Sequence, residues 1–422
     1  MDSKRIIFFG GQGSRLLCSS RPVSRTHEQH ESSVVSLLLS TCHAAFLREA
    51  IQAQSQSTPT WAKLDTAISP ESLLTVPHTH SDNPILHGVC LCVNQLVGYL
   101  EYDNTLEKLK QAIPIGFCSG MLPAMVLACS NTVEEYIKFS GEAVRLAYWI
   151  GYRAAELSQG LSGKSDKAQL WGLSLSGKDR ETVERNVQSF NSNVPESSHI
   201  RLASRFGKTA FSIVGPGHAL EAFRSLNVSA SCKAEEVHVH ALYHGGDKGL
   251  TALSNVLEDV RRRDISFPPL AAMNRPIWSC ENESLVGAST LGSTSPLEYT
   301  LRLILVDKSD LYSTWLSAVD TVTSSGKDWE IITVGQGSNA LLASVCRDVV
   351  RPANTIWIDV PGGQSRGAAE LRQSDSFAIV GMSVNFPLGE GKEGFWEMLE
   401  QGLNAATQVR QFAMRLKTKI CS

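Results

Sequence analysis

The segment Gly116-Phe117-Cys118-Ser119-Gly120 decides the predicted fold, because it sets a nucleophilic residue between two glycines where a strand meets a helix. Ile113-Pro114-Ile115 predicts the strand, and MLPAMVLACS (121–130) predicts the helix. A Cβ atom on either glycine would crowd so sharp a turn. We therefore expect Cys118 to be an exposed nucleophile, with the backbone N–H of Ser119 facing the oxyanion. A buried structural cysteine beside unrelated glycines is the alternative that these five residues leave open.

A cysteine nucleophile needs a general base, and the sequence offers 11 histidines. His244 lies in ALYHGGD (241–247), after an apparent strand at 237–240 and before a glycine turn. Such a position presents a side chain to a cleft, so we favour His244 over His218 and His240. Two histidines on one face of the apparent strand could bind a metal, but no third ligand is evident, and we expect no metal site.

A second glycine-rich turn, Gly10-Gly11-Gln12-Gly13, follows the apolar strand expected at residues 5–9. It lacks the Lys-Ser/Thr pair of a nucleotide-binding P-loop, and its spacing differs from the dinucleotide fingerprint. A loop that supplies a second backbone N–H to an oxyanion fits its place after a strand better.

The rest of the chain alternates between strand and helix patterns, which predicts an α/β protein. A β-α-β-α block between residues 171 and 226 indicates a small domain inserted into a larger one. Residues 361–375 have the composition of a linker, and a new strand is expected at 377–382. The remaining helices are expected at 32–54, 84–100, 104–113, 134–159, 247–264 and 338–350, and strands at 331–334 and 355–360.

The composition indicates a globular protein with two or three folding units. Of 422 residues, 42% are hydrophobic and 19% charged, which excludes disordered and fibrous classes. The net charge of −3 gives no basic field for nucleic acid or for an anionic membrane. The N-terminal apolar run is too short for a signal peptide, and 84–100 is too interrupted to span a membrane. Ten scattered cysteines predict free thiols and a cytoplasmic location.

Taken together, these segments resemble the acyltransferase family of fatty acid and polyketide synthases. More narrowly, residues 4–360 resemble the starter-unit acyl-carrier-protein transacylase (SAT) domain of fungal non-reducing polyketide synthases. FFGGQGS (8–14) matches the opening strand and glutamine loop, and GFCSG (116–120) matches the cysteine form of the nucleophile elbow. ALYHGGD (241–247) matches the histidine segment, and VGQGSNALL (334–342) resembles the closing glycine turn.

The resemblance implies a malonyl-transacylase-like acyltransferase fold, with an α/β-hydrolase-like large subdomain and an inserted ferredoxin-like small subdomain. The transacylase domain would span residues 1–360, with the small subdomain at about 165–235 and a linker at 361–375. Residues 376–405 resemble the beginning of a ketosynthase domain, whereas the basic tail at 406–422 matches nothing. This organisation implies a truncated synthase.

The resemblance also implies roles for six residues: Cys118 as nucleophile, His244 as base, Gln12 and Ser119 as oxyanion-hole donors, and Gly116 and Gly120 as the elbow glycines. Malonyl-type members carry an arginine before a glycine in the helix after the elbow, and Ile150 takes that place here. A site without that cation should take an uncharged acyl group, because an unpaired carboxylate is costly to bury. Arg145 and Arg153 are the nearest cations in the sequence.

The implied function is the loading of an uncharged acyl starter unit onto an acyl carrier protein through a cysteine acyl-enzyme, in polyketide biosynthesis. The donor would be acyl-CoA or the acyl-phosphopantetheine of an upstream synthase's carrier protein. No bound cofactor, nucleic acid or membrane partner is expected. Two alternatives stay open: a thioester hydrolase with the same Cys118–His244 pair, and an inactive truncated fragment.

Overall fold

The computed structural model divides the chain into two units, Met1–Ser365 and Arg366–Ser422. Within the second unit, the described residues form an antiparallel strand pair, β12 (Asn385–Phe386) and β13 (Gly389–Glu390). The structure describes residues 4–12, 33–54, 64, 68–74, 76, 80–162, 170–227, 232–269, 273–281, 285–286, 295–324, 329–335, 337–346, 355–360, 385–386 and 389–390.

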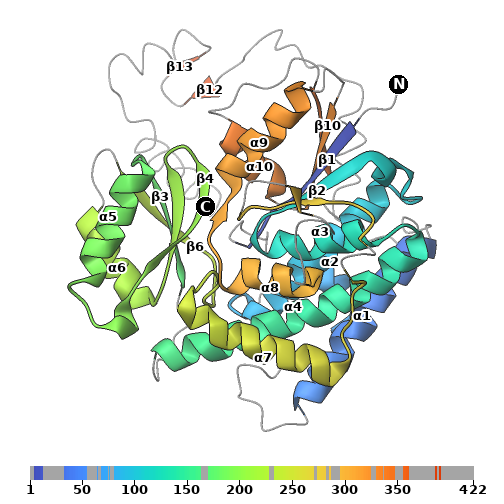
Figure 1. The fold of residues 1–422 in the computed structure, drawn as a ribbon, viewed down its shortest axis with the longest axis horizontal. Coiled ribbons are helices and arrows are strands. Elements are labelled where there is room, and N and C mark those ends of the chain that lie inside the picture. The colour runs from blue at the N-terminus through green and yellow to red at the C-terminus, as the bar shows by residue number, and fades with distance from the viewer. Residues whose placement is uncertain are drawn as a thin grey trace, which may run out of the picture. The chain divides into compact units, whose positions relative to one another are not determined.

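The first unit contains a six-stranded sheet with the order β11-β10-β1-β2-β7-β8 (Figure 1). Its central strands are parallel, and such strands are apolar on both faces: Ile6, Ile7, Phe8 and Phe9 of β1 are at most 1% exposed. The carboxyl ends of β1 and β2 lie together, with Phe9 beside Gly116. The strands are β1 (Lys4–Phe9), β2 (Ala112–Gly116), β7 (Ile277–Trp278), β8 (Leu285–Val286), β10 (Trp329–Val334) and β11 (Thr355–Val360).

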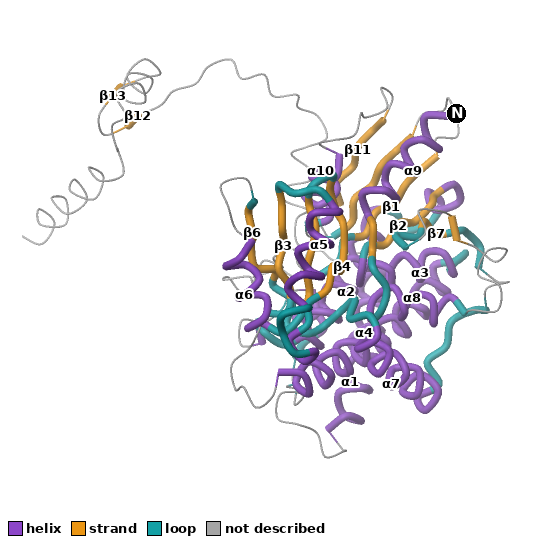
Figure 2. Tube along the Cα trace, turned by 60° about the vertical axis from the view of Figure 1, so that its left-hand side comes forward, coloured by secondary structure: helices purple, strands orange, loops and turns teal. Residues whose placement is uncertain are grey.

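Helices cover both faces of this sheet (Figures 1 and 2). Ile7 and Phe9 pack into one core with α1 to α4, while Ile6 and Phe8 point to the opposite face and pack with α9 and α10. The helices are α1 (Ser33–Gln54), α2 (Pro84–Tyr102), α3 (Met121–Cys129), α4 (Val133–Ser162), α7 (Asp247–Arg263), α8 (Pro296–Leu305), α9 (Leu311–Ser324) and α10 (Ser338–Val345).

Within α1, the segment Val34–Gln54 is long and apolar enough to cross a membrane by length and composition alone. In the structure its side chains Leu38, Cys42 and Phe46 are fully buried in the core. Glu49 of the same helix is also fully buried and is paired with an arginine of α4. This is the packing of a core helix of a folded domain.

A second sheet has the order β6-β3-β5-β4-β9, and α5 and α6 cover one of its faces. Along the chain its main elements run β-α-β-β-α-β, which is the ferredoxin-like order. The other face of this sheet borders a cavity. The elements are β3 (Gly172–Ser176), α5 (Arg180–Asn191), β4 (Arg201–Gly207), β5 (Ala210–Val214), α6 (Gly217–Asn227), β6 (Lys233–Val237) and β9 (Ser309–Asp310).

Most of the predicted elements are confirmed with small shifts at their ends, but three predictions are wrong. The helix expected at 104–113 is a short 3₁₀ helix, Glu107–Gln111, followed directly by β2. The strand expected at 237–240 ends at Val237, because the Val239 N–H turns back to the Val237 carbonyl at 2.7 Å. The predicted β-α-β-α block omitted two strands, β4 and β6, because their charged residues interrupt the apolar pattern of a strand.

The predicted linker at 361–375, the strand at 377–382 and the tail at 406–422 lie outside the described residues. The same holds for nearly all of residues 376–405. The predicted ketosynthase segment therefore stays a prediction.

Candidate active site

Cys118 lies at the sharp turn between β2 and α3, in a left-handed backbone conformation with φ of 54°. Non-glycine residues rarely adopt this conformation, which costs about 1–2 kcal/mol. Both predicted elbow glycines are required by close backbone contacts. A Cβ atom on Gly120 would lie 2.3 Å from the Phe9 carbonyl oxygen, and one on Gly116 would lie 2.5 Å from the Met121 Cα atom. The turn thus holds Cys118 directly above the ends of β1 and β2.

His244 faces this cysteine, with its Nε2 atom 3.0 Å from the Cys118 Sγ atom. Its other ring nitrogen, Nδ1, lies 2.8 Å from the backbone carbonyl oxygen of Asp307. A carbonyl only accepts, so Nδ1 carries the proton and Nε2 is left to receive one from the thiol. The two alternative histidines lie elsewhere: His218 contacts Ser198, and His240 makes an edge-to-face ring contact with another histidine.

The end of α8 holds the backbone around His244. The N–H groups of His244 and Gly245 donate to the carbonyls of Ile304 and Leu305 at 3.0 and 2.8 Å. These are carbonyls of the last turn of a helix, which lack partners within the helix itself. The sequence analysis missed α8, although Ser295, Pro296 and Glu298 form a recognisable helix start. It also missed Asp307, whose backbone carbonyl leaves no signal in residue type.

The backbone N–H groups of Ser119 and Gln12 lie beside the Cys118 thiol, and both act to lower its pKa. The Gln12 N–H also lies 3.1 Å from the Ser119 hydroxyl oxygen. The loop that carries Gln12 is anchored at Gly10, whose carbonyl accepts from the Gln95 side chain at 2.7 Å. The structure therefore gathers all four predicted polar site residues at one point, where negative charge on sulfur or oxygen would meet two donors.

The pKa of Cys118 is lowered from its ordinary value of 9.0. Burial would raise it, but the charge and hydrogen bond of His244, together with the two backbone N–H groups, outweigh burial. The pKa of His244 is correspondingly raised from 6.5: burial would lower it, but Cys118 and the Asp307 carbonyl raise it. Both shifts favour a thiolate–imidazolium pair.

Other buried cysteines of the chain show the opposite behaviour. Burial raises the pKa of Cys42, Cys90, Cys129 and Cys280 to about 12. None of these four lies beside an imidazole in the way Cys118 does, so burial acts without a compensating charge. The contrast indicates that the environment of Cys118 suits a reactive thiol rather than a structural one.

A cavity of about 440 Å³ opens beside the pair, between the two sheets. Phe117, Ala340 and Leu341 line it from the large subdomain, and Ser212 and Val214 line it from the small one. Cys118 lines this cavity but is only 8% exposed, so it is more enclosed than the elbow motif predicts. No lysine or arginine is among the described residues that line the cavity.

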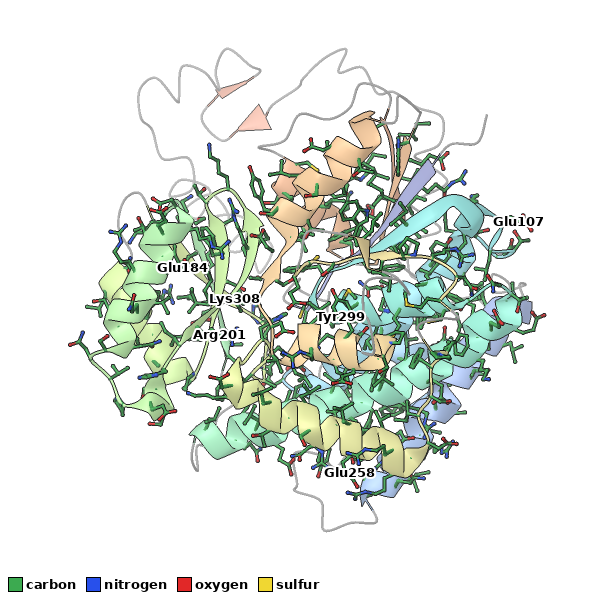
Figure 3. All side chains as sticks on the ribbon, viewed as in Figure 1. Glu107, Glu184, Arg201, Glu258, Tyr299 and Lys308 are labelled. Atoms are coloured by element: carbon green, nitrogen blue, oxygen red, sulfur yellow. The ribbon has the colours of Figure 1, made fainter. Side chains whose placement is uncertain are left out.

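Arg201 does not line this cavity, but it lies against Gly246 of the histidine loop, where its charge acts to lower the pKa of His244. It lines a separate groove, together with Glu184 and Lys308 (Figure 3). Ile150, at the place of the malonyl-type arginine, is 4% exposed and belongs to the large core.

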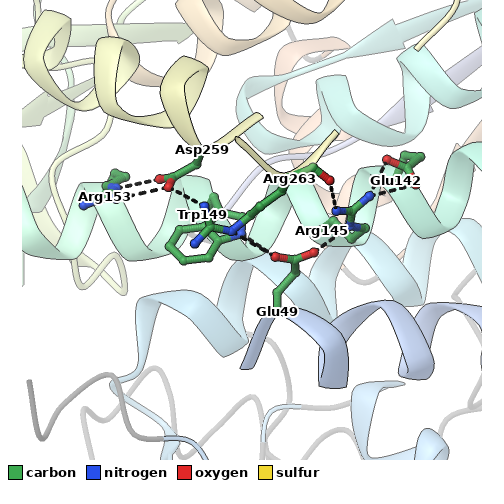
Figure 4. Close-up of polar contacts among 7 residues, drawn as sticks. All are labelled: Glu49, Glu142, Arg145, Trp149, Arg153, Asp259 and Arg263. Atoms are coloured by element: carbon green, nitrogen blue, oxygen red, sulfur yellow. Dashed lines mark hydrogen bonds and ion pairs between the residues drawn. The ribbon is translucent and has the colours of Figure 1, made fainter. Parts of the chain in front are cut away.

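Arg145 and Arg153, which flank Ile150 in α4, are held by buried carboxylates (Figure 4). The Arg145 Nε atom lies 2.6 Å from Glu49, and the Arg153 Nε atom lies 2.7 Å from Asp259. Both carboxylates are fully buried. These pairs remove the two arginines as binding groups for a carboxylated substrate.

No group of three metal-ligating side chains occurs within the described ranges of the chain. His240 and His87 meet edge to face with ring centroids 5.3 Å apart, and His87 also contacts the Ser81 carbonyl. Because β6 ends at Val237, His238 and His240 do not share a strand as a metal pair on one strand face would require.

A model of the family described as "starter unit:ACP transacylase in aflatoxin biosynthesis" matches residues 7–244, more than half of the chain. The orsellinic acid synthase ArmB of Armillaria ostoyae is 28% identical over 433 residues, covering 97% of this chain and 19% of that protein. The non-reducing polyketide synthase VdtA of Byssochlamys spectabilis is 24% identical over 375 residues, covering 82% of this chain and 16% of that protein. The chain thus spans less than a fifth of the length of these curated relatives.

Solved acyltransferases share the fold. The acyltransferase domain from the second module of the salinomycin polyketide synthase superposes with a TM-score of 0.58 at 14% identity, covering 87% of this chain and 70% of that one. Malonyl CoA-acyl carrier protein transacylase from Burkholderia pseudomallei gives 0.56 at 12% identity, covering 82% and 99%. The predicted acyltransferase fold is confirmed. The chain is an acyltransferase and belongs to the starter unit:ACP transacylase family.

Proposed function

We propose that this chain loads an uncharged acyl starter unit onto an acyl carrier protein through an acyl-enzyme on Cys118. The observation that carries the proposal is the 3.0 Å contact between the Cys118 Sγ and His244 Nε2 atoms on a strained turn. The donor is the thioester of CoA or of an upstream carrier protein. The reaction needs no bound cofactor or metal, because both half-reactions exchange one thioester for another.

In the first half-reaction, His244 Nε2 takes the proton of Cys118, and the thiolate attacks the donor carbonyl carbon. The N–H groups of Gln12 and Ser119 stabilise the oxyanion that forms. The intermediate then collapses, the bond between the carbonyl carbon and the donor sulfur breaks, and the leaving thiolate takes the proton from His244.

In the second half-reaction, the phosphopantetheine thiol of the carrier protein gives its proton to His244 and attacks the acyl-enzyme. Cys118 leaves as the thiolate and recovers a proton from His244. Exchange between thioesters is close to neutral in energy, so the chain has to supply orientation and exclusion of water. The small exposed fraction of His244, 5%, supports such exclusion.

The absence of cations among the described lining residues supports an uncharged acyl group. A carboxylated extender such as malonyl would bring a charge into the cavity, where Glu235 also lies, and would find no partner. Ile150 gives no positive charge at the place where malonyl-type members carry arginine. We therefore expect acetyl or longer alkyl chains to load and malonyl to be rejected.

Mass spectrometry of the protein after incubation with acyl-CoA thioesters tests this function. We expect a single acyl adduct on Cys118 with acetyl-CoA or a longer alkanoyl-CoA, and none with malonyl-CoA. Cys118→Ala should lose the adduct, while Cys129→Ala, which removes a buried thiol with a pKa of about 12, should keep it. Full labelling of Cys118→Ala would contradict the assignment of the nucleophile.

Three further assignments accompany this proposal. The carrier protein is the protein partner, with no nucleic acid or membrane involved. Eight described cysteines are free, which supports a reducing compartment such as the cytoplasm. Residues 376–405 begin a ketosynthase domain, which is supported by the match to the orsellinic acid synthase ArmB that covers 97% of this chain.

A further inference from the structure

A row of polar side chains crosses the open face of the small sheet, in the cavity that contains the Cys118 sulfur. The strand register sets Ser174 of β3 beside both Ser212 of β5 and Glu235 of β6, and sets Ser204 of β4 beside Ser212. The hydroxyls of Ser204 and Ser212 are hydrogen-bonded at 2.6 Å, which places them on the same face. All four residues line the cavity, and we call them the serine row.

The opposite face of the same strands is apolar. Leu173, Leu175, Phe211 and Ile213 are buried under α5 and α6 at 2% exposure or less. The small sheet therefore separates a dry core from a face that carries hydroxyls and a carboxylate. Ser204 and Ser212 would keep their mutual hydrogen bond under a hydrocarbon chain, but such a chain would offer Ser174 and Glu235 no hydrogen-bond partner, which is unfavourable. The serine row suits an occupant with polar groups along its length.

We propose that the serine row binds the amide groups of the pantetheine arm that CoA and carrier-protein donors share. The inference rests on the proposed transfer function, because it concerns the donor of that reaction. The arm carries two amides separated by two methylene groups, about 5 Å apart by standard bond lengths. Neighbouring strands are about 4.8 Å apart, so the two amides can meet side chains of adjacent strands.

The hydrogen-bonding chemistry matches on both sides. The serine hydroxyls can donate to the amide carbonyls, and the Glu235 carboxylate can accept from an amide N–H. A charged acceptor makes the stronger kind of hydrogen bond. Both amides are neutral, so the carboxylate has no like charge to repel at this point of the arm.

The next row of the sheet fits the thiol end of the arm. It includes Gly172, Val214 and Val237, which face one another across β3, β5 and β6 and also line the cavity. On β4 the register sets Arg201 beside Val214, and Arg201 lies against Gly246 of the histidine loop, so this row lies on the catalytic side of the serine row. The short ethylene segment between the thioester sulfur and the first amide would pass over it. The apolar part of the cavity thus lies where the ethylene segment of the arm would pass, and the serine row lies where its amides would follow.

The test compares two donors with the same acyl group: a pantetheine thioester, with two amides, and an ethanethiol thioester, with none. The measured quantity is the rate constant for acylation of Cys118 with each donor, and their ratio reports the contribution of the arm. Ser174→Ala should lower this ratio about tenfold, which corresponds to one lost hydrogen bond of about 1.4 kcal/mol. Glu235→Gln, an exposed position, should lower it in the same direction.

Ser176→Ala is the matched control, because Ser176 lies on β3 one row further from His244 and is not among the described lining residues. It should leave the ratio unchanged. A ratio that stays unchanged in Ser174→Ala, which includes equal losses with both donors, would overturn the proposal. An unchanged ratio in Glu235→Gln as well would confirm that result. A change in acyl chain-length preference without a change in the ratio would overturn it too, since the row would then contact the acyl group. If the unaltered chain is acylated by neither donor, the transfer function itself fails and the inference with it.

Discussion

At the scale of single residues, the pairing of Cys118 with His244 makes a pH prediction. The pKa of Cys118 is lowered by His244 against the effect of burial, and alkylation requires the thiolate. We expect alkylation by iodoacetamide to accelerate as the pH rises and to level off below pH 9. In His244→Ala, burial acts without the imidazole and raises the pKa of Cys118, so the thiolate fraction and with it the alkylation rate at pH 7 should fall sharply.

His218→Ala is the control for this experiment. His218 was the other histidine next to a glycine turn, but it lies in an exposed contact with Ser198. Its removal should leave the pH profile unchanged. A profile of His244→Ala that superposes on that of the unaltered chain would exclude the pairing as the cause of the lowered pKa.

The elbow glycines make a second prediction at this scale. Gly120→Ala would set a Cβ atom 2.3 Å from the Phe9 carbonyl oxygen, and the backbone on both sides would have to move. We expect a loss of about 1–3 kcal/mol in unfolding free energy, measured by urea denaturation. Gly160→Ala in α4 has no atom within 4 Å of the new Cβ, so it should stabilise the helix by up to about 1 kcal/mol. Equal effects of the two changes would contradict the close packing of the elbow.

Residue patterns singled out Cys118 and His244, which the structure brings together, but not the groups that orient His244. The glycine-flanked cysteine and the histidine before a glycine turn carry signals in residue type and spacing. Asp307 carries none, because it acts through its backbone carbonyl, which any residue has and which accepts a hydrogen bond from the His244 Nδ1–H group. The serine row was also absent from the prediction, since its members come from four strands whose register the sequence does not specify.

At the scale of elements, α1, α4 and α7 are joined by a buried ionic cluster (Figure 4). Glu49 of α1 accepts from Arg145 and from the Trp149 indole, and Arg263 of α7 lies over the indole ring at 3.6 Å. Glu49→Ala would leave buried guanidinium charges without this carboxylate. We expect a loss of about 3–5 kcal/mol in unfolding free energy by urea denaturation.

Glu156→Ala is the comparison for this cluster. Glu156 pairs with Arg153 at 2.7 Å, but its side chain is 47% exposed, so its removal should cost less than about 1 kcal/mol. A loss for Glu49→Ala no larger than for Glu156→Ala would show that the buried cluster contributes little to stability.

Some helices and strands of the chain can be predicted from its sequence, and others cannot. The long helix α4 follows from its apolar periodicity, and α2, which is buried on nearly all sides, follows from the length of its apolar run. The strands β4 and β6 do not, because one face of each borders the cavity and carries charged or hydroxyl side chains. A strand that lines a binding cavity loses the alternation that identifies strands with one buried face.

At the scale of the whole molecule, all residues of the proposed site lie in the unit Met1–Ser365. The two sheets and the cavity between them belong to this unit as well. We therefore expect a chain shortened to residues 1–365 to fold, and we expect iodoacetamide to alkylate its Cys118 at the same rate as in the longer chain. A circular dichroism spectrum and the iodoacetamide rate check this, and loss of the fast-reacting thiol would contradict it.

The measurement that tests the central claim most directly follows the acyl group from an isolated acyl-enzyme. The acylated protein is mixed with a carrier protein bearing phosphopantetheine, with the same carrier protein lacking that arm, or with buffer, and the masses are followed over time. Transfer predicts that the acyl mass moves from Cys118 to the arm-bearing carrier protein and stays on Cys118 in the other two samples. Release of free acid at one rate in all three samples would contradict the account, because the pair would then serve hydrolysis.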